Sequence, residues 1–339
     1  GCPRDAAVTG RQGRPRKRRM AVRICPRRKE LSMNAWPRIA RLTLFMLFAT
    51  GGAGSVAAST SCDVVALPGV GGKNVKAWKL ADGGIAAFSG MNINIDGYGR
   101  AYHPRNREAG AVLHLCVGAR IWLPDGTSYE GSDPPANCTG KFMTDLAKIA
   151  AAGWTDPSVG AVEWYGVAAE GSVTIAGRTI RGVKPLLQKD GSGFYVSPTS
   201  LVDRSVPDIA DQRRYPNPLR VPSAVLPRSV AQQGVALGSF GVAIHASKQK
   251  AVPFVVGDGG PKIGEGSPAL ARQVSGMAPS DDIDLKNRYA GQVDKPEVLW
   301  VFFGGEALPY DHRREGDVAV NAQAAFERWG GAARLAQCL

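Results

Sequence analysis

The chain has 339 residues, of which 44% are hydrophobic and 21% are charged, and its net charge is +13. Its 42 glycines and 23 prolines favour a turn-rich, mainly β protein and argue against a helical bundle. The charge does not indicate a nucleic-acid-binding domain, because residues 1–32 alone hold 11 Lys/Arg and 2 Asp/Glu, and residues 59–339 carry a net charge of only +2. A nucleic-acid binder needs its basic groups on a folded face.

Residues 33–58 have the pattern of a secretory signal peptide. Arg38 and Arg41 form a positive n-region, an apolar run follows at residues 42–49, and small residues end at Ala58. This arrangement predicts cleavage after Ala58. The apolar run is too short to act as a membrane anchor, so we expect a secreted or periplasmic protein with no anchor after cleavage.

The segment before the signal peptide is expected to lie outside the functional protein. Residues 1–32 precede Met33, a natural start, and we expect them to be a non-native basic extension; the alternative is a genuine basic extension. Residues 59–339 are then expected to form the functional domain.

Four cysteines lie downstream of the predicted cleavage site, and an even number in an exported chain predicts two disulfide bonds. Three pairings are possible. We favour Cys116–Cys138, within one segment, and Cys62–Cys338, which would join the two ends of the domain. The sequence has no CxxC spacing and no His/Cys/Asp cluster with ligand spacing, so we expect neither a metal site nor a cofactor.

Short apolar runs bounded by glycine and proline predict a series of β-strands. In chain order these segments are 86–97, 171–180 (a hairpin), 193–203, 220–227, 234–247, 250–258, 262–271 and 297–305. The last is almost continuously apolar, which indicates burial on both faces. Closely spaced short strands of this kind are typical of a sandwich or a closed barrel in a single domain.

Two segments have helical periodicity, and we expect both to be packing helices. The first covers residues 141–154 and ends at Gly153; the second covers residues 317–331, with Asp317 as its N-cap and an end at Gly330. Their expected apolar faces are Phe142, Leu146, Ile149 and Ala150 in the first helix and Val318, Ala322, Ala325, Phe326 and Trp329 in the second.

The stretch Val255–Ser267, VVGDGGPKIGEGS, contains two carboxylates seven positions apart. We expect a buried strand to end at Asp258, Gly259–Pro261 to reverse the chain, and the chain to re-enter the sheet just before Glu265. Such a hairpin would bring the two side chains to about 10 Å or less from each other. Inverting glycoside hydrolysis requires a carboxylic acid and a carboxylate roughly 6.5–9.5 Å apart. Spacing alone does not distinguish this pair from turn residues.

The same stretch resembles the signature of the fungal-type chitosanases, glycoside hydrolase family 75. Members carry a Gly-Asp-x-Gly-Pro turn, then Ile-Gly-Glu-x-Ser and a short apolar helix. The matching residues are Gly257, Asp258, Gly260, Pro261, Ile263, Gly264, Glu265 and Ser267. Weaker resemblances to other family segments occur in the right order at residues 91–104, 193–203, 221–227, 234–244 and 297–307. Together they cover roughly residues 80–310.

The resemblance implies endo-hydrolysis of β-1,4-linked glucosamine polymers such as chitosan, with inversion, by a monomer that needs no cofactor. It implies Glu265 as general acid and Asp258 as general base. The hairpin is also similar to that of double-psi barrels. The implied fold is therefore mainly β (α+β): a single domain with a six-stranded double-psi-like β-barrel core, a few short helices and an inserted disulfide loop. Two alternatives stay open: a non-catalytic barrel that binds cell-wall glycan, and a peptidoglycan-active enzyme on a similar barrel.

The sequence departs from the family pattern at three places. Ser223 stands where the family often has Tyr, Ser239 stands where it often has Asp, and residues 106–161 look like an insertion that would reshape the cleft. The polymer could therefore be another amino-sugar glycan.

Several residues are candidates for substrate contact, each with a structural alternative. Asp96 is either a turn residue or a contact, and Tyr102 and His103 are either contacts or core residues. Weaker candidates are Trp164 and Tyr165 as a sugar platform and Asp281, Asp282 and Asp284 as an acidic lining.

Overall fold

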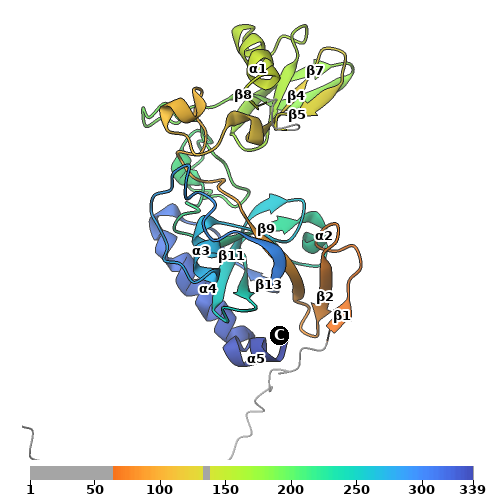
Figure 1. Cartoon of the computed structure of the whole chain (residues 1–339), viewed down its shortest axis with the longest axis vertical. Coiled ribbons are helices and arrows are strands. Elements are labelled where there is room, and N and C mark those ends of the chain that lie inside the picture. The colour runs from red at the N-terminus through yellow and green to blue at the C-terminus, as the bar shows by residue number, and fades with distance from the viewer. Residues whose placement is uncertain (1–63, 133–137, 339) are drawn as a thin grey trace, which may run out of the picture. The chain divides into compact units, whose positions relative to one another are not determined.

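The computed structural model describes residues 64–132 and 138–338, and six of their strands close into a mixed β-barrel (Figure 1). The ring runs in the order β3, β12, β9, β11, β10, β13, and β13 pairs back with β3. The expected mainly β fold with a six-stranded barrel is confirmed. The strands of the barrel are β3 (Ile85–Ile93), β9 (Ser223–Pro227), β10 (Ser239–His245), β11 (Ala251–Gly260), β12 (Glu265–Gly266) and β13 (Val293–Ala307).

The order of the ring corrects one expectation, because β11 and β12 do not form a hairpin. Strand β9 lies between them: Asp258 of β11 is paired with Val225, and Gly266 of β12 is paired with Ala224. After β11 the chain therefore passes β9 and joins the parallel strand β3, where Glu265 is paired with Asn92. The reason is that closing the barrel requires β12 to fill the gap between β3 and β9.

The barrel interior is built from the most apolar strands. The five residues 298–302 of β13 are each at most 1% exposed, which confirms burial of this strand on both faces. Phe254 of β11 meets Trp300 and Phe302 with ring centroids 5.9 and 5.3 Å apart. Edge-to-face aromatic packing of this kind adds to the stability that apolar burial gives.

Helix α4 (Glu315–Trp329) packs against β10 and β11 (Figure 1). The predicted apolar face is confirmed at Ala322 and Phe326, but Asp317 is not the N-cap. The helix begins two residues earlier because the turn η5 (His312–Arg314) runs directly into it, and Asp317 instead pairs with Arg314. The other helices of this part are α2 (Arg228–Ala231), α3 (Pro268–Val274) and α5 (Gly331–Cys338).

Residues 94–222, which we call the inserted region, lie between β3 and β9 and contribute no strand to the barrel. They are therefore more extensive than the expected insertion at 106–161. The region has its own hydrophobic core, which includes Ile121, Phe142 and Ile149. Its elements are η1 (Asn106–Ala109), η2 (Leu115–Gly118), β4 (Ala119–Trp122), β5 (Ser128–Glu130), α1 (Lys141–Ala151), β6 (Ala161–Trp164), β7 (Ala169–Ile175), β8 (Arg178–Pro185) and η4 (Gln212–Arg214).

The predicted helix at 141–154 and the predicted hairpin at 171–180 are confirmed. The predicted strand at 193–203 is wrong, because this segment forms only a single bridge, between Tyr195 and Leu187. Its backbone makes scattered hydrogen bonds to several segments, such as Tyr195 N–H to the Tyr102 carbonyl and Leu201 N–H to the Gly257 carbonyl. The Gln212 amide adds two more, because it donates to the Ser197 carbonyl and accepts from the Ser197 N–H. Strands β1 (Val64–Ala66) and β2 (Lys76–Leu80) extend the sheet next to β3.

The predicted disulfide bond between Cys116 and Cys138 is confirmed, with the two Cα atoms 5.2 Å apart. The predicted pairing of Cys62 with Cys338 involves a residue outside the described ranges, and so do the expected signal peptide and basic extension. Among residues 64–132 and 138–338, no helix has the length and apolar character needed to cross a membrane.

Candidate active site

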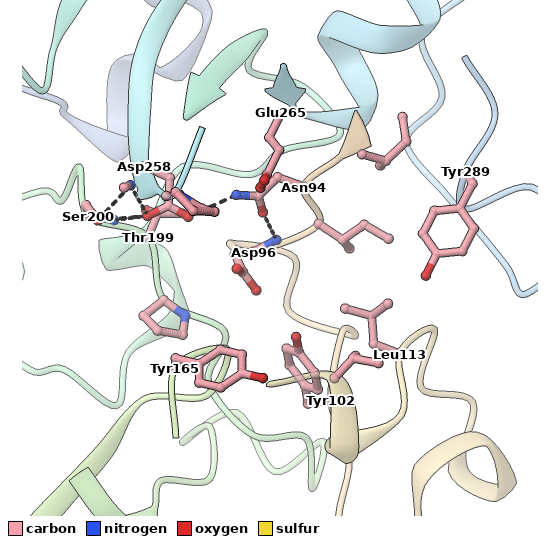
Figure 2. Close-up of a pocket in the computed structure, with 17 residues that line it drawn as sticks. Asn94, Asp96, Tyr102, Leu113, Tyr165, Thr199, Ser200, Asp258, Glu265 and Tyr289 are labelled. Atoms are coloured by element: carbon pink, nitrogen blue, oxygen red, sulfur yellow. Dashed lines mark hydrogen bonds between the residues drawn. The ribbon is translucent and has the colours of Figure 1, made fainter. Parts of the chain in front are cut away.

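A pocket of about 680 Å³ lies at the ends of β3 and β11 and beside β12, and both predicted catalytic carboxylates line it (Figure 2). Asp258 reaches it from β11 and Glu265 from β12. Asp96 and Tyr102, two of the predicted substrate contacts, line it as well. Four of the five predicted site residues therefore meet in one cavity, although only two of them come from the stretch that suggested the site.

The carboxylate of Asp258 is held by four hydrogen bonds. Its Oδ1 accepts from the Ser200 N–H at 2.9 Å, from the Ser200 hydroxyl at 2.8 Å and from the Gly259 N–H at 2.8 Å. Its Oδ2 accepts from the Asn94 side-chain amide at 3.1 Å. These donors fix the orientation of the carboxylate, and Oδ2, with a single donor, keeps more capacity to accept a proton or to bind a water.

Glu265 has a different environment. Its carboxyl group is partly buried and makes no hydrogen bond within the described residues. Burial raises its pKa; the positive charge of Lys262 lowers it and the negative charge of Asp258 raises it, so that the net pKa lies above its ordinary value. A raised pKa allows a carboxyl group to keep a proton and act as a general acid.

The backbone between β11 and β12 explains why both acids face this pocket. Gly264 has a φ of +115°, and a Cβ there would lie 2.4 Å from the Ser89 hydroxyl. A Cβ on Gly260 would lie 2.2 Å from a methyl group of Val225. Both positions therefore require glycine. The predicted reversal at Gly259–Pro261 is wrong, because β11 does not end at Asp258 and continues through Gly259 and Gly260, which are paired with β9.

The strand order sets the distance between the backbones that carry the two acids. Because β9 separates β11 from β12, two inter-strand steps of about 4.8 Å place these backbones about 9–10 Å apart. The Glu265 side chain extends across this gap, since a Cβ on Gly260 of β11 would lie 3.8 Å from its Oε2. The Glu265 carboxyl group therefore approaches the strand that carries Asp258.

Asp96 is a third carboxyl group in the pocket (Figure 2). Its N–H donates to the Asn94 Oδ1 at 2.8 Å, so that Asn94 joins it to Asp258. Its Oδ1 is buried and has no hydrogen-bond partner in the described part of the chain. Burial, followed by the charges of Asp258 and Glu265, raises the pKa of Asp96 well above its ordinary value. A carboxyl group that keeps its proton can donate a hydrogen bond to an oxygen atom of a ligand.

Three tyrosines complete the lining: Tyr102, Tyr165 and Tyr289 (Figure 2). Tyr165 is 53% exposed, and its hydroxyl donates to Glu130, which holds the ring in place. Trp164, the other residue of the predicted platform, is buried and donates its ring N–H to the Val183 carbonyl, so it belongs to the core. Tyrosine rings offer flat apolar faces with a polar end, which suits a pyranose ring.

His103 does not line the pocket. It is buried, its Nδ1 accepts from the Arg105 N–H, and its ring packs edge-on against Phe194 at 5.0 Å. The acidic run is also elsewhere: Asp281 pairs with Arg220, and Asp284 accepts from the N–H groups of its own turn. These residues have structural roles in the described chain.

Two clusters have ligand-type atoms close together, and neither is attractive for a metal. In the first, the sulfur atoms of Cys116 and Cys138 are joined in the disulfide and are not thiolates. In the second, the Asp203 Oδ2 already accepts from both the N–H and the ring Nδ1 of His312. A metal ion there would have to replace these hydrogen bonds.

Sequence reasoning missed Asn94, Ser200 and Tyr289. Asn94 and Ser200 contact Asp258 from positions 164 and 58 residues away in the chain. Only the asparagine and serine content of the segments before Asp96 and after Pro198 hinted at hydrogen-bonding groups there, and nothing local indicated their partner.

Comparison with protein-family models found no match, and none of the curated proteins matched the chain. The resemblance to the fungal-type chitosanases is therefore carried by the residues quoted above and by no whole-chain similarity.

Proposed function

We propose that the protein is an exported endo-acting glycoside hydrolase that cleaves β-1,4-linked amino-sugar polymers by inversion. The observation that carries this proposal is the meeting of Asp258 and Glu265 in one cavity, on strands that are separated by β9. The cavity of about 680 Å³ has room for a sugar and for the attacking water that inversion requires.

Inverting hydrolysis needs one carboxyl group that gives a proton and one carboxylate that takes a proton, and the surroundings of Glu265 and Asp258 suit these two roles. Glu265, whose pKa burial raises, is the general acid that protonates the leaving glycosidic oxygen. Asp258, oriented by Ser200, Gly259 and Asn94, is the general base that takes a proton from water through its Oδ2. The water oxygen attacks the anomeric carbon as the bond to the leaving oxygen breaks, so that the configuration at this carbon inverts.

The lining of the pocket supports an amino sugar as the substrate. Asp258, the carboxylate that acts as the base, disfavours an anion in this cavity, and the carboxyl groups of Asp96 and Glu265 can form hydrogen bonds to the hydroxyl and amino groups of a sugar. Tyr165, which is 53% exposed, offers a ring face for pyranose stacking, whereas Tyr102 is buried in the core of the inserted region. The disulfide between Cys116 and Cys138 agrees with an oxidising compartment outside the cytosol, which supports export.

The experiment is to incubate the purified protein with chitosan, chitin and peptidoglycan and to measure new reducing ends. We expect Asp258→Asn and Glu265→Gln each to lower kcat by about a hundredfold to ten-thousandfold, the range for loss of a general acid or base. Asp125→Asn is the matched control, because Asp125 is an exposed acid in the turn between β4 and β5.

Full activity in both pocket variants would refute the assignment of the pair. Proton NMR of the first-formed anomer tests the stereochemistry: an initial α-anomer from a β-linked polymer indicates inversion, and an initial β-anomer would contradict it.

A further inference from the structure

A second cavity of about 680 Å³ continues from the first. The two cavities share Leu113, Val117 and Tyr289 as lining residues, so they form two sections of one groove. The new section is lined mainly by η1 and the residues around it, together with Arg288 from the loop before β13. A polymer that passes through the first section has a path into the second.

The charge of the groove reverses between the two sections. Arg105, Arg107 and Arg288 line the second section, and Glu108 is the one acidic residue among its described lining. Burial and the nearby Arg107 lower the pKa of His114, which also lines it, so the imidazole is neutral near pH 7 and does not repel the arginines.

The three arginines are not neutralised by the protein. None of them forms an ion pair with any residue in the ranges 64–132 and 138–338, whereas other arginines of the chain, such as Arg120 and Arg334, do so. The guanidinium carbon of Arg288 lies 4.7 Å from the Tyr289 ring centre, and its Nε is buried without a hydrogen-bond partner. Guanidinium groups held in this way are suited to a planar carboxylate, which accepts two parallel N–H donors.

A uniform polymer of glucosamine would place ammonium groups against these arginines, which like-charge repulsion disfavours. A glycan with acetylated amino groups brings no ammonium group to the arginines, and a carboxylate on one of its sugars would be attracted to them. Resting on the proposed function for the first section, we infer that the second section binds a carboxylate of the same glycan, so that the substrate is an amino-sugar polymer with acidic substituents, as in peptidoglycan, and not plain chitosan.

The test compares two matched ligands by titration calorimetry. One is a β-1,4-linked tetrasaccharide of alternating N-acetylglucosamine and N-acetylmuramic acid; the other is the same molecule with its lactyl carboxylates converted to amides. We expect the wild-type protein to bind the acid at least tenfold more tightly than the amide, and we expect this preference to shrink as salt is added. Equal affinity for the two ligands would overturn the inference.

The variant Arg105→Gln/Arg107→Gln/Arg288→Gln should bind acid and amide equally. Arg181→Gln is the matched control, because Arg181 is an exposed arginine on β8 without an ion pair, and it should keep the preference. A triple variant that still prefers the acid would also overturn the inference. If the protein cuts no glycan, the proposed function fails, while the difference between acid and amide still decides whether the second section binds a carboxylate.

Discussion

The pocket joins two regions of the molecule that are stabilised in different ways. The acids belong to barrel strands whose backbones are paired on both sides and whose core is formed by residues such as Phe254 and Trp300. Two of the tyrosines, Tyr102 and Tyr165, belong to the inserted region, which has a separate core around Phe142 and a disulfide bond. The barrel therefore carries the backbone of the two reacting groups, while the inserted region supplies the surfaces that recognise a ligand and also Asn94 and Ser200, which orient Asp258.

The difference teaches that chemistry and specificity in this protein can vary separately. A barrel strand cannot move Asp258 without losing its pairing to β9. By contrast, loops stabilised by their own core can change Tyr165 or the arginines of η1 without disturbing the barrel. The following predictions test this division, beginning with the largest effect.

Removal of the disulfide should destabilise the inserted region most. In Cys116→Ser/Cys138→Ser we expect the free energy of unfolding of this region to fall by about 3 kcal/mol, because the bond closes a loop with a sequence separation of 22 residues. Hydrogen exchange should speed up in β4, β6 and α1 and stay slow in the barrel strands β10 and β13. The measurement is native-state hydrogen exchange followed by mass spectrometry.

An equal increase of exchange in both regions would show that they unfold as one cooperative unit, and the division between them would then be wrong. Asn106→Ala tests the same region without touching the sulfur atoms, because the Asn106 Oδ1 accepts from the Leu115 N–H at 2.8 Å. Its effect should be smaller, about 1 kcal/mol.

Where the inserted region begins, directly after β3, loss of Asn94 should lower kcat. Asn94→Ala removes the donor to the Asp258 Oδ2 and the acceptor for the Asp96 N–H. Because hydrogen bonds to charged groups contribute about 1.5–3 kcal/mol, we expect kcat to fall by roughly tenfold to a hundredfold with little change in KM. Thr199→Ala is the control, since the Thr199 hydroxyl lines the pocket but donates to Leu201 and not to Asp258. A change in KM alone would mean that Asn94 binds substrate and does not position Asp258.

The two regions also differ in how well the sequence predicts them. Long apolar runs were sufficient to predict strands β10, β11 and β13. The two acids do line one pocket, although the hairpin from which this was predicted does not form. The order of the strands was not predictable, because β12 has only two residues, and its pairing with β3 and β9 depends on how the whole barrel closes. No local pattern encodes such a choice, since each pairing joins distant segments.

In the inserted region only some local elements were predicted: strands β4, β5 and β6 were not, and the strand predicted at 193–203 does not form. The helix at 141–154, the hairpin at 171–180 and the Cys116–Cys138 bond follow from periodicity, turn residues and cysteine count. The place of Tyr289 in the pocket depends on a long loop folding beside Leu113, and the sequence gives no sign of this contact. Predictions from sequence were therefore best for short-range features and for residues fixed by backbone constraints.

A smaller effect is expected at Tyr165, on the side of the inserted region. Tyr165→Ala should raise KM about threefold to tenfold and leave kcat nearly unchanged, because an aromatic face contributes about 0.5–1.5 kcal/mol to stacking. Tyr165→Phe keeps the ring, loses the hydrogen bond to Glu130, and should stay close to the wild-type KM. Steady-state kinetics on a soluble oligosaccharide measures both. If Phe is as harmful as Ala, the hydroxyl and not the ring face is what matters, and Tyr165 is no platform.

The smallest effect concerns Lys262, whose positive charge lowers the pKa of Glu265 against the stronger effect of burial. A general acid works only while protonated, so activity should fall as the pH rises through the pKa of Glu265. Lys262→Ala removes the opposing charge and raises this pKa further, which should move the alkaline limb of the kcat profile to higher pH. The shift should be small and should shrink in high salt, because Lys262 is exposed. Lys79→Ala, an exposed lysine on β2, should leave the limb in place. In Lys262→Ala the alkaline limb could instead stay in place or move to lower pH. Either result would mean that a group other than Glu265 supplies the proton. The next variant would then be Asp96→Asn, because Asp96 is the other carboxyl group with a raised pKa in the pocket.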